Sequence, residues 1–153
     1  MSAVLNNAPS FRPMCLDDLE KVMASELKIY SHPWTFGNFR DSLNAGYSCW
    51  IYEYGESLIG YGLVMLAAGE AHLLNVGISK EWQRQGMGRK LMQHLIKVSR
   101  EYQAEFMFLE VRPSNIPAIR LYEDIGFNEM AIRKNYYPAH GGREDAVLMG
   151  MTL

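Results

Sequence analysis

The sequence has few of the features that mark disulfide-stabilised, metal-binding or covalent-nucleophile proteins. Its 153 residues include two cysteines, Cys15 and Cys49, which are too few for a disulfide framework. Both fall in expected strands, and a reduced intracellular protein is the favoured interpretation, although one disulfide bond is not excluded. The histidines and cysteines show neither metal-ligand spacing nor a local Cys–His signature. We therefore expect no metal and no acyl-enzyme.

The sequence also lacks a long apolar run and a strong charge of either sign. The longest apolar run, residues 58–69, is interrupted by glycines and is shorter than the ~20 residues that span a bilayer. A net charge of −2 and a pI near 6.1 argue against binding of nucleic acid through its phosphates. Residues 1–9 have no basic region followed by an apolar one, so we expect a flexible tail and no secretory signal. These absences favour a cytoplasmic protein that binds neither nucleic acid nor membrane.

With 48% hydrophobic residues, the chain can bury a core of its own, and we expect one domain over residues 10–153. Apolar spacing and turn residues divide it into elements. The expected order is a strand at 11–14, helices at 16–27 and 36–43, strands at 47–54, 57–67 and 71–78, a helix at 87–102, a strand at 105–111, a helix at 116–125, and strands at 127–136 and 146–152. Thr35 and Asn115 are expected helix caps. This βααβββαβαββ order predicts an α/β (α+β) fold with a mixed, mostly antiparallel sheet of six or seven strands flanked by helices.

The most informative segment is Gln83-Arg84-Gln85-Gly86-Met87-Gly88-Arg89, where a strand is expected to turn into a helix. Met87, Leu91, Leu95, Val98 and Tyr102 then recur at helical spacing. The first N–H groups of a helix lack intrahelical acceptors, and the helix dipole adds partial positive charge, so a pyrophosphate is stabilised there. Glycine lets the backbone approach such a group closely. The alternative is a tight glycine turn with solvated arginines.

A second segment lies downstream. Leu109-Glu110-Val111-Arg112-Pro113-Ser114-Asn115 is followed by Ala118, Leu121, Tyr122, Gly126 and Phe127. The combined pattern is Q-x-x-G-x-G, then a strand with an acidic residue, then N-x-x-A-x-x-L-Y-x-x-x-G-F. It resembles the GNAT N-acetyltransferases, which use acetyl-coenzyme A, from about Asn75 to the C-terminus. Residues 133–138 and 142–146, with Pro33-Trp34-Thr35, resemble the RimI-type ribosomal-protein-alanine N-acetyltransferases within that family.

The resemblance implies that acetyl-coenzyme A is the co-substrate. It implies that the strand at Val76, Gly77 and Ile78 pairs with the pantetheine arm through its backbone, and that this main chain polarises the acetyl carbonyl. A glycine bulge in an ordinary strand is the alternative at Gly77. The implied cofactor-binding residues are Val76, Gly77, Ile78, Arg84, Gln85, Gly86, Met87, Gly88, Arg89 and Asn115.

Two residues are implied to act on protons. An α-amino group has a pKa near 7.7–8.0 and needs little help to lose its proton at neutral pH. The resemblance gives the role of proton acceptor to Glu110, directly or through water, whereas an ion pair with Arg112 is the alternative. It gives Tyr122 the role of proton donor to the departing coenzyme A sulfur, whereas core packing of the ring is the alternative.

The resemblance also implies the acceptor. Trp34, Tyr136 and Tyr137 are expected to contact the substrate, which in the RimI-type proteins is the N-terminal alanine of a small-subunit ribosomal protein, bS18-like. Adjacent tyrosines are also ordinary strand formers. Alternative functions are acetylation of a lysine or a small amine, or a non-catalytic module that binds acyl-coenzyme A. The resemblance also leaves room for a tRNA-modification complex as a further partner.

Overall fold

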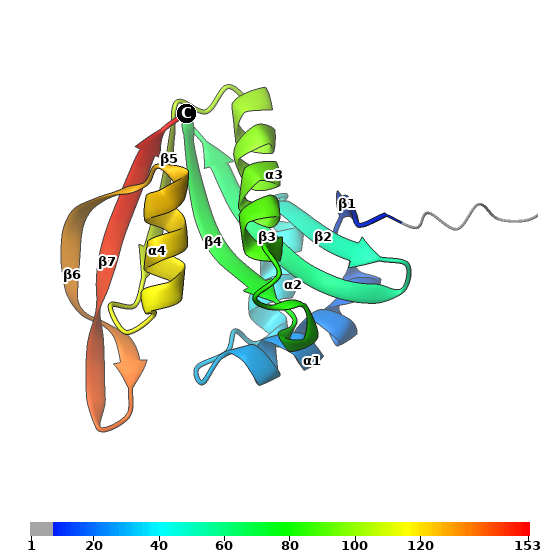
Figure 1. Cartoon of the computed structure of the whole chain (residues 1–153), viewed down its shortest axis with the longest axis horizontal. Coiled ribbons are helices and arrows are strands. Elements are labelled where there is room, and N and C mark those ends of the chain that lie inside the picture. Colours follow the sequence, from blue (N-terminus) through cyan, green and yellow to red (C-terminus); the bar gives the residue numbers. More distant parts are fainter. Residues whose placement is uncertain (1–7) are drawn as a thin grey trace, which may run out of the picture. The chain divides into compact units, whose positions relative to one another are not determined.

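The structure, a computed structural model, describes residues 8–153. The expected tail at residues 1–9 therefore lies mostly outside the described residues. The elements are β1 (Ser10–Pro13), η1 (Leu16–Asp18), α1 (Leu19–Ile29), α2 (Phe36–Asn44), β2 (Ser48–Tyr54), β3 (Ser57–Ala67), β4 (Glu70–Ile78), η2 (Lys80–Trp82), α3 (Met87–Glu101), β5 (Phe106–Val111), α4 (Ile116–Ile125), β6 (Asn128–Ala139) and β7 (Gly142–Thr152) (Figure 1).

The predicted order of elements is confirmed, with two short 3-10 helices added. The strands form one sheet of seven strands in the order β1-β2-β3-β4-β5-β7-β6, and the expected α/β fold is confirmed. β4 and β5 pair in parallel, whereas the pairs β1–β2, β2–β3, β5–β7 and β6–β7 are antiparallel. Two compact units result: residues up to Val64 with Asn75–His94, and Met65–Leu74 with Leu95–Leu153.

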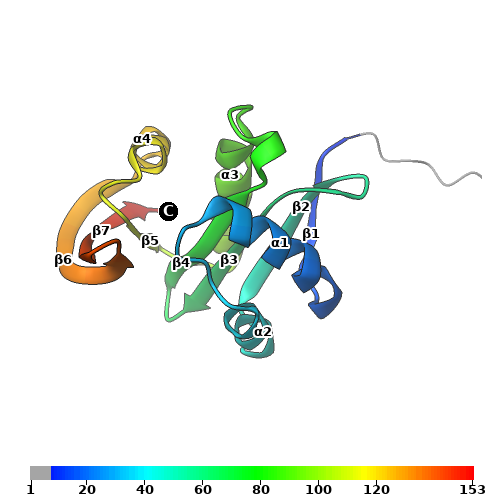
Figure 2. The ribbon, with the colours of Figure 1, turned by 90° about the horizontal axis from the view of Figure 1, so that it is seen from below.

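The first unit has a core on both faces of its strands. Figure 2 shows α2 and α3 on opposite sides of them. On one face, Phe39 of α2 meets the ring of Tyr61 edge-on at 5.9 Å between centroids. On the other face, His94 of α3 stacks on Phe11 at 4.0 Å and meets Trp50 at 4.5 Å. Period-2 alternation along the strands supplies apolar side chains to both layers.

The second unit is built on β5 and the long β6–β7 hairpin, with α4 beside it (Figure 1). Met107, Leu109 and Val111 of β5 are buried, whereas Phe106 is exposed and Phe108 and Glu110 are half-buried. Alternate residues of a strand point to opposite faces, so Glu110 lies on the more exposed face of β5.

Three predictions about local structure were wrong. Cys15 lies before η1 rather than in a strand, and its N–H donates to Asp18 Oδ2 at 2.8 Å. Tyr102 is 71% exposed rather than part of the apolar face of α3, because the helix ends at Glu101 and the chain turns at Gln103, whose φ is +61°. The segment left between the expected strands at 127–136 and 146–152 is mostly strand, because β6 runs to Ala139 and β7 begins at Gly142. Pro138 is tolerated there because β6 is an edge strand, where a missing N–H leaves no ladder partner unpaired.

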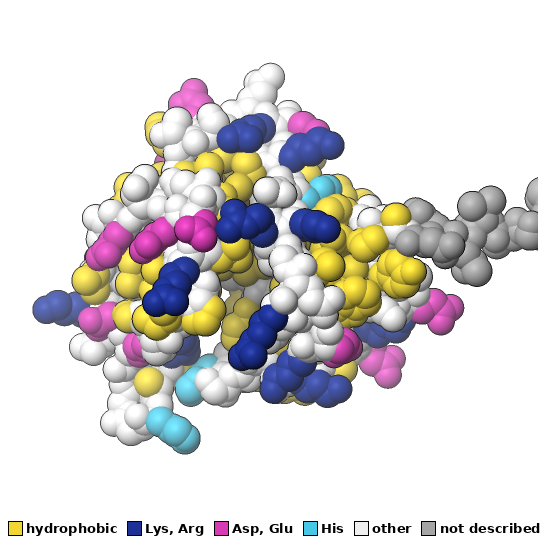
Figure 3. Space-filling model, viewed as in Figure 1, with side chains coloured by type: hydrophobic (Ala, Val, Ile, Leu, Met, Phe, Trp, Pro, Cys, Tyr) yellow, Lys and Arg dark blue, Asp and Glu magenta, His cyan; other side chains and the backbone are white. Residues whose placement is uncertain are grey.

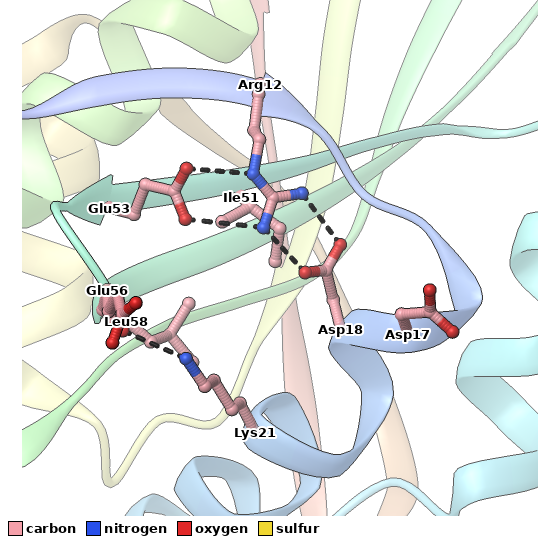
Figure 4. A pocket seen from close by; sticks show the side chains of 8 residues that line it. All are labelled: Arg12, Asp17, Asp18, Lys21, Ile51, Glu53, Glu56 and Leu58. Atoms are coloured by element: carbon pink, nitrogen blue, oxygen red, sulfur yellow. Dashed lines mark hydrogen bonds and ion pairs between the residues drawn. The ribbon is translucent and has the colours of Figure 1, made fainter. Parts of the chain in front are cut away.

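A pocket in the first unit is organised by the guanidinium of Arg12, which lies between two carboxylates (Figure 4). Its Nη2 donates to Asp18 at 2.6 Å, and its Nε donates to Glu53 at 2.8 Å. Hydrogen bonding to Arg12 lowers the pKa of Asp18 to about 2. None of the predicted site residues lines this pocket, and its central guanidinium is paired with the carboxylates of Asp18 and Glu53. We interpret it as a structural ion-pair cluster that ties β1 to β2 and η1.

Asp18→Asn tests this cluster. A depressed carboxyl pKa contributes stability above the unfolded-state pKa, and this contribution is lost as the pH falls toward the folded-state value. We expect a loss of about 1–2 kcal/mol in the free energy of unfolding at pH 7, since the pair is partly exposed. The difference between variant and parent should shrink below about pH 4, where the unfolded carboxyl is protonated. Urea titrations of variant and parent at pH 7 and pH 3 measure this difference in the free energy of unfolding.

The control is Asp17→Asn, because Asp17 lines the same pocket but makes none of the hydrogen bonds to Arg12. Its effect should stay within about 0.5 kcal/mol. Equal effects of the two substitutions would contradict the assigned role of Asp18.

Candidate functional site

The glycine segment forms an exposed turn that leads into α3. Gly86 has φ of +79°, and a Cβ built on it would meet nothing within 4 Å. Arg84 also adopts a positive φ, +62°, which is unusual for a residue with a side chain. Met87 and Gly88 begin the helix, and the first carbonyl used is that of Gly86, which accepts from Lys90 N at 3.3 Å. The amides of this first turn therefore have no acceptor within the helix.

The charge around this turn suits an anion. Arg84, Arg89 and Lys90 are exposed, and Figure 3 shows basic side chains along both sides of the helix labelled α3 in Figure 1. Gln85 does not face outward as a donor, because its Nε2 donates to Glu81 O at 3.0 Å and braces the turn. A helix start with a positive φ, an open approach and clustered cations is a suitable site for a phosphate group.

The end of β4 is fixed by side chains from outside the strand. The carbonyl of Val76 accepts from the Tyr30 hydroxyl, and the carbonyl of Ile78 accepts from Gln83 Nε2 at 2.9 Å. Gly77 is buried, and a Cβ there would lie 2.5 Å from the Tyr61 ring. The close approach that requires glycine at this position is therefore that of Tyr61.

Trp34, predicted to contact the substrate, is half-buried in the same unit. Its ring packs against Phe39 at 5.1 Å between centroids, and its backbone N–H donates to Glu26 Oε2 at 2.9 Å. Glu26 is 1% exposed and also accepts from Tyr61 and Asn75. Sequence reasoning missed Glu26, although a carboxylate among the apolar positions of the first helix was a usable signal.

In the second unit, the Glu110 carboxylate pairs with Arg133 Nη1 at 3.3 Å. The alternative pair with Arg112 does not form, because Arg112 donates to Glu144 at 3.3 Å and to Pro138 O at 2.7 Å. The Glu110 side chain is itself 26% exposed, so its carboxylate is reachable from solvent. The ion-pair partner of Glu110 could not be found from spacing, since Arg133 comes from another strand, β6.

Tyr136 and Tyr137 lie beside Glu110. Burial, and then the charge of Glu110, raises the pKa of both hydroxyls above the ordinary value. Their rings meet at 4.9 Å and 74°, and Arg112 lies 4.4 Å from the centroid of the Tyr137 ring. Tyr122 also contributes to the raised pKa of Tyr137, which places it in the same group of side chains.

A bulge in β6 sets the directions of these tyrosines. The β6–β7 register shifts between Arg133 and Tyr137, and Asn135 takes a positive φ of +53°. Side chains of β7 replace the missing ladder bonds: Asp145 accepts from Asn135 N at 2.9 Å, and Arg143 donates to the carbonyls of Asn135 and Tyr136. Bulges commonly re-aim side chains in this way.

Tyr122 of α4 is buried, and burial raises its pKa to about 12. Its hydroxyl is therefore protonated at neutral pH and able to donate. The ring also packs against Phe127 at 5.8 Å, so the core-packing interpretation and the donor interpretation are compatible. Asn115 caps α4 as expected and accepts from Ala118 N at 3.3 Å.

Comparison with known proteins decides the family. The sequence model of the acetyltransferase (GNAT) family matches residues 18–127. The chain belongs to the GNAT acetyltransferase family. This confirms the predicted family and enzyme class, and the two segments that carried the prediction lie within or at the edge of the matched residues.

Individual GNAT relatives match over most of the chain. The [ribosomal protein bS18]-alanine N-acetyltransferase of Escherichia coli (strain K12) is 35% identical over 89% of this chain and 92% of its own length. The protein of the same name from Haemophilus influenzae is 38% identical over 89% of this chain and 93% of its own length.

Solved structures agree with these matches. The ribosomal-protein-S18-alanine N-acetyltransferase from Escherichia coli superposes with a TM-score of 0.89 at 33% identity, covering 95% of this chain and 94% of that one. Ard1 from Thermoplasma volcanium gives a TM-score of 0.87 at 26% identity, covering 95% and 98%.

Two other kinds of site are absent from the described part of this GNAT protein. Within residues 8–153, no group of three or more histidine, cysteine or acidic side chains is arranged to hold a metal ion. In the same part of the chain, no helix has the length and apolar character needed to cross a bilayer.

Gly86→Ala tests the backbone requirement of the turn. The methyl group enters open space, so the cost comes from the positive φ alone, and we expect a loss of about 1–2 kcal/mol in the free energy of unfolding. Gly142→Ala is the matched control, because its Cβ also meets nothing within 4 Å but its φ lies outside the positive region. Denaturant titrations of both variants should separate them. A cost for Gly142→Ala as large as that for Gly86→Ala would show that backbone conformation is not the cause.

Proposed function

We propose that this protein transfers an acetyl group from acetyl-coenzyme A to the α-amino group of a protein N-terminus, with the N-terminal alanine of a bS18-like ribosomal protein as the acceptor. The observation that carries the proposal is the group formed by Glu110, Tyr136 and Tyr137 in the second unit. The names of the relatives at 35% and 38% identity support the acceptor.

The proposal assigns the acyl donor to main-chain groups of the first unit. Amides of Met87 and Gly88 would bind the diphosphate, and the exposed cations Arg84 and Arg89 would add charge to that site. The β4 backbone at Val76, Gly77 and Ile78 would pair with the pantetheine arm, and Asn115 would contact the same arm. Acetyl-coenzyme A supplies the activated acyl group as a thioester.

Glu110 would accept the proton of the α-ammonium group. In the structure its carboxylate already pairs with a cation, the mostly exposed guanidinium of Arg133. An incoming ammonium carries the same charge and can replace Arg133 without leaving the carboxylate uncompensated. Because an α-amine has a pKa near 7.7–8.0, a carboxylate or a carboxylate-bound water is a sufficient base.

Tyr122 would donate a proton to the departing sulfur. A thiol has a pKa near 8.5, so its thiolate leaves more readily when a neutral hydroxyl lies nearby. Burial keeps the Tyr122 hydroxyl neutral, since its pKa is raised to about 12. Tyr136 and Tyr137 of the second unit would contact the acceptor's first residue, and Trp34 of the first unit is proposed as a further substrate contact.

Other acceptors and a non-catalytic role are the alternatives to this proposal. A lysine side chain has a pKa near 10.4 and needs a stronger base than the α-amine does. The buried Tyr122 and the reachable Glu110 favour catalysis over mere binding of acyl-coenzyme A. A cytoplasmic location and an association with a tRNA-modification complex also remain predictions.

Incubation with acetyl-coenzyme A and peptides that differ only in their first residue tests the function. The bS18-like peptide with N-terminal alanine should gain label on its α-nitrogen, as read by tandem mass spectrometry. A matched peptide with a blocked N-terminus and a free lysine should gain none. Labelling of the lysine peptide alone, or binding of acetyl-coenzyme A without any transfer, would overturn the proposal.

Tyr122→Phe tests the donor assignment. Loss of the hydroxyl should lower kcat about ten- to hundredfold, within or below the usual range for general acid catalysis, while the Kd for coenzyme A changes little. Since the pKa of Tyr122 is about 12, the parent enzyme should show no loss of activity from its ionisation up to about pH 10. Tyr102→Phe is the control, because Tyr102 is 71% exposed after α3. An unchanged kcat in Tyr122→Phe would remove the donor role.

A further inference from the structure

Glu26 of α1 is a buried carboxylate that the proposed chemistry does not use. The residue is only 1% exposed. Oε1 accepts from the Tyr61 hydroxyl at 2.6 Å, and Oε2 accepts from the backbone N–H of Trp34 at 2.9 Å. Asn75 Nδ2 donates to both oxygens, at 3.4 and 3.2 Å.

All three donors to this carboxylate are neutral groups. Burying a charge without a cation is costly, and a buried ionic group replaced by an apolar one of similar volume often leaves stability unchanged or improved. Stability alone therefore gives a weak reason for glutamate at this position. Unlike an apolar side chain, the carboxylate accepts hydrogen bonds, and these fix both the distance and the direction of its three donors.

The three donors come from segments with separate proposed roles. Trp34 lies in the segment before α2 that is proposed to contact the acceptor. Asn75 immediately precedes the β4 residues proposed to pair with the acyl donor. Tyr61 lies on β3, and its ring fits only because Gly77 has no Cβ.

The neighbouring contact extends this arrangement. Tyr30 follows Glu26 by one helical turn, its N–H donates to Glu26 O at 3.0 Å, and its hydroxyl donates to the Val76 carbonyl. Position 26 thus links α1 to Asn75 through its side chain and, through the next turn, to Val76. β4 is therefore held at two successive residues, through the side chain of Asn75 and the backbone carbonyl of Val76.

We infer that Glu26 is a positioning residue, which sets the acceptor segment at Trp34 and the β4 strand at Asn75 and Val76 in register with each other for acetyl transfer. The inference rests on the proposed function. Its basis is a single buried acceptor shared by both segments. Small displacements of reacting groups are costly, since about 1 Å of misplacement can lower a rate by about a hundredfold.

Glu26→Met and Glu26→Gln separate positioning from structure. Methionine fills a similar volume but accepts no strong hydrogen bond, so Trp34 and Asn75 lose their common acceptor. The glutamine oxygen can still accept from Trp34 and Asn75, while its amide donates to the Tyr61 oxygen. We expect Glu26→Met to lower kcat/KM for the acceptor peptide at least about tenfold. Glu26→Gln should retain most of this kcat/KM. Both variants should bind coenzyme A at the turn before α3 within about twofold of the parent, because the hydrogen bonds of Glu26 go to Trp34, Tyr61 and Asn75 rather than to that turn.

Ser25→Ala is the matched control. Ser25 is the neighbour of Glu26 on α1, is buried, and hydrogen-bonds Ser79 Oγ at 2.8 Å just after β4. The substitution removes a buried polar contact between α1 and the residue that follows β4, and it leaves the contacts of Trp34, Asn75 and Val76 in place. Its melting temperature should fall, because the Ser79 hydroxyl loses its partner, whereas its kcat/KM should stay within about twofold of the parent.

If Glu26→Met does not fold, Asn75→Ala tests the same link, because it frees β4 from Glu26 and leaves the Trp34 contact in place. We expect kcat to fall at least about fivefold with the acceptor KM unchanged. Parent-like kcat/KM in folded Glu26→Met, or parent-like kcat in Asn75→Ala, would overturn the inference. Absence of acetyl transfer by the parent protein would instead overturn the proposed function, since the variants are compared only with an active parent.

Discussion

The arrangement of the first unit depends on one constraint, the need to satisfy a carboxylate buried on α1. Glu26 has no cation among its hydrogen-bond donors, so its oxygens must be filled by neutral donors from the chain around it. Tyr61 can serve only if its ring crosses β4 where residue 77 is glycine. The sequence of β4, the approach of Trp34 and the face of β3 are consequently coupled through one acceptor.

The second unit meets a comparable requirement with exposed groups. Where β6 leaves the ladder, its backbone N–H and C=O groups need partners, and Asp145 and Arg143 of the opposite strand supply them. The result is a bulge of fixed shape rather than a loose loop. These backbone contacts hold Tyr136 and Tyr137 beside Glu110, in addition to the contacts of their own rings with each other and with Arg112.

Features written in adjacent residues were predictable from the sequence, and those that need a distant partner were not. Thr35 caps α2 and Asn115 caps α4 as expected, because a cap is a contact over three residues. The bounds of β3 and α4 agree with those expected, because turn and cap residues adjacent in the sequence mark their ends. The Arg133 partner of Glu110 and the length of the β6–β7 hairpin escaped prediction. Arg133 lies on β6, which is separated from β5 by β7, and the length of the hairpin depends on how β6 pairs with β7. Gly77 was predicted to allow the close approach of the cofactor, whereas the close approach of the Tyr61 ring was found only in three dimensions.

The two halves of the proposed reaction are specified by different kinds of group. The acyl donor is assigned mainly to main-chain amides, whose availability depends on backbone angles such as the positive φ of Gly86. Many sequences that keep those angles can therefore bind the same donor. The acceptor is assigned to side chains, Trp34, Tyr136 and Tyr137, each held in place by a residue elsewhere. A change of acceptor thus requires only altered side chains or altered supports, whereas a change of donor requires a different backbone, and family membership constrains the donor more tightly than the acceptor.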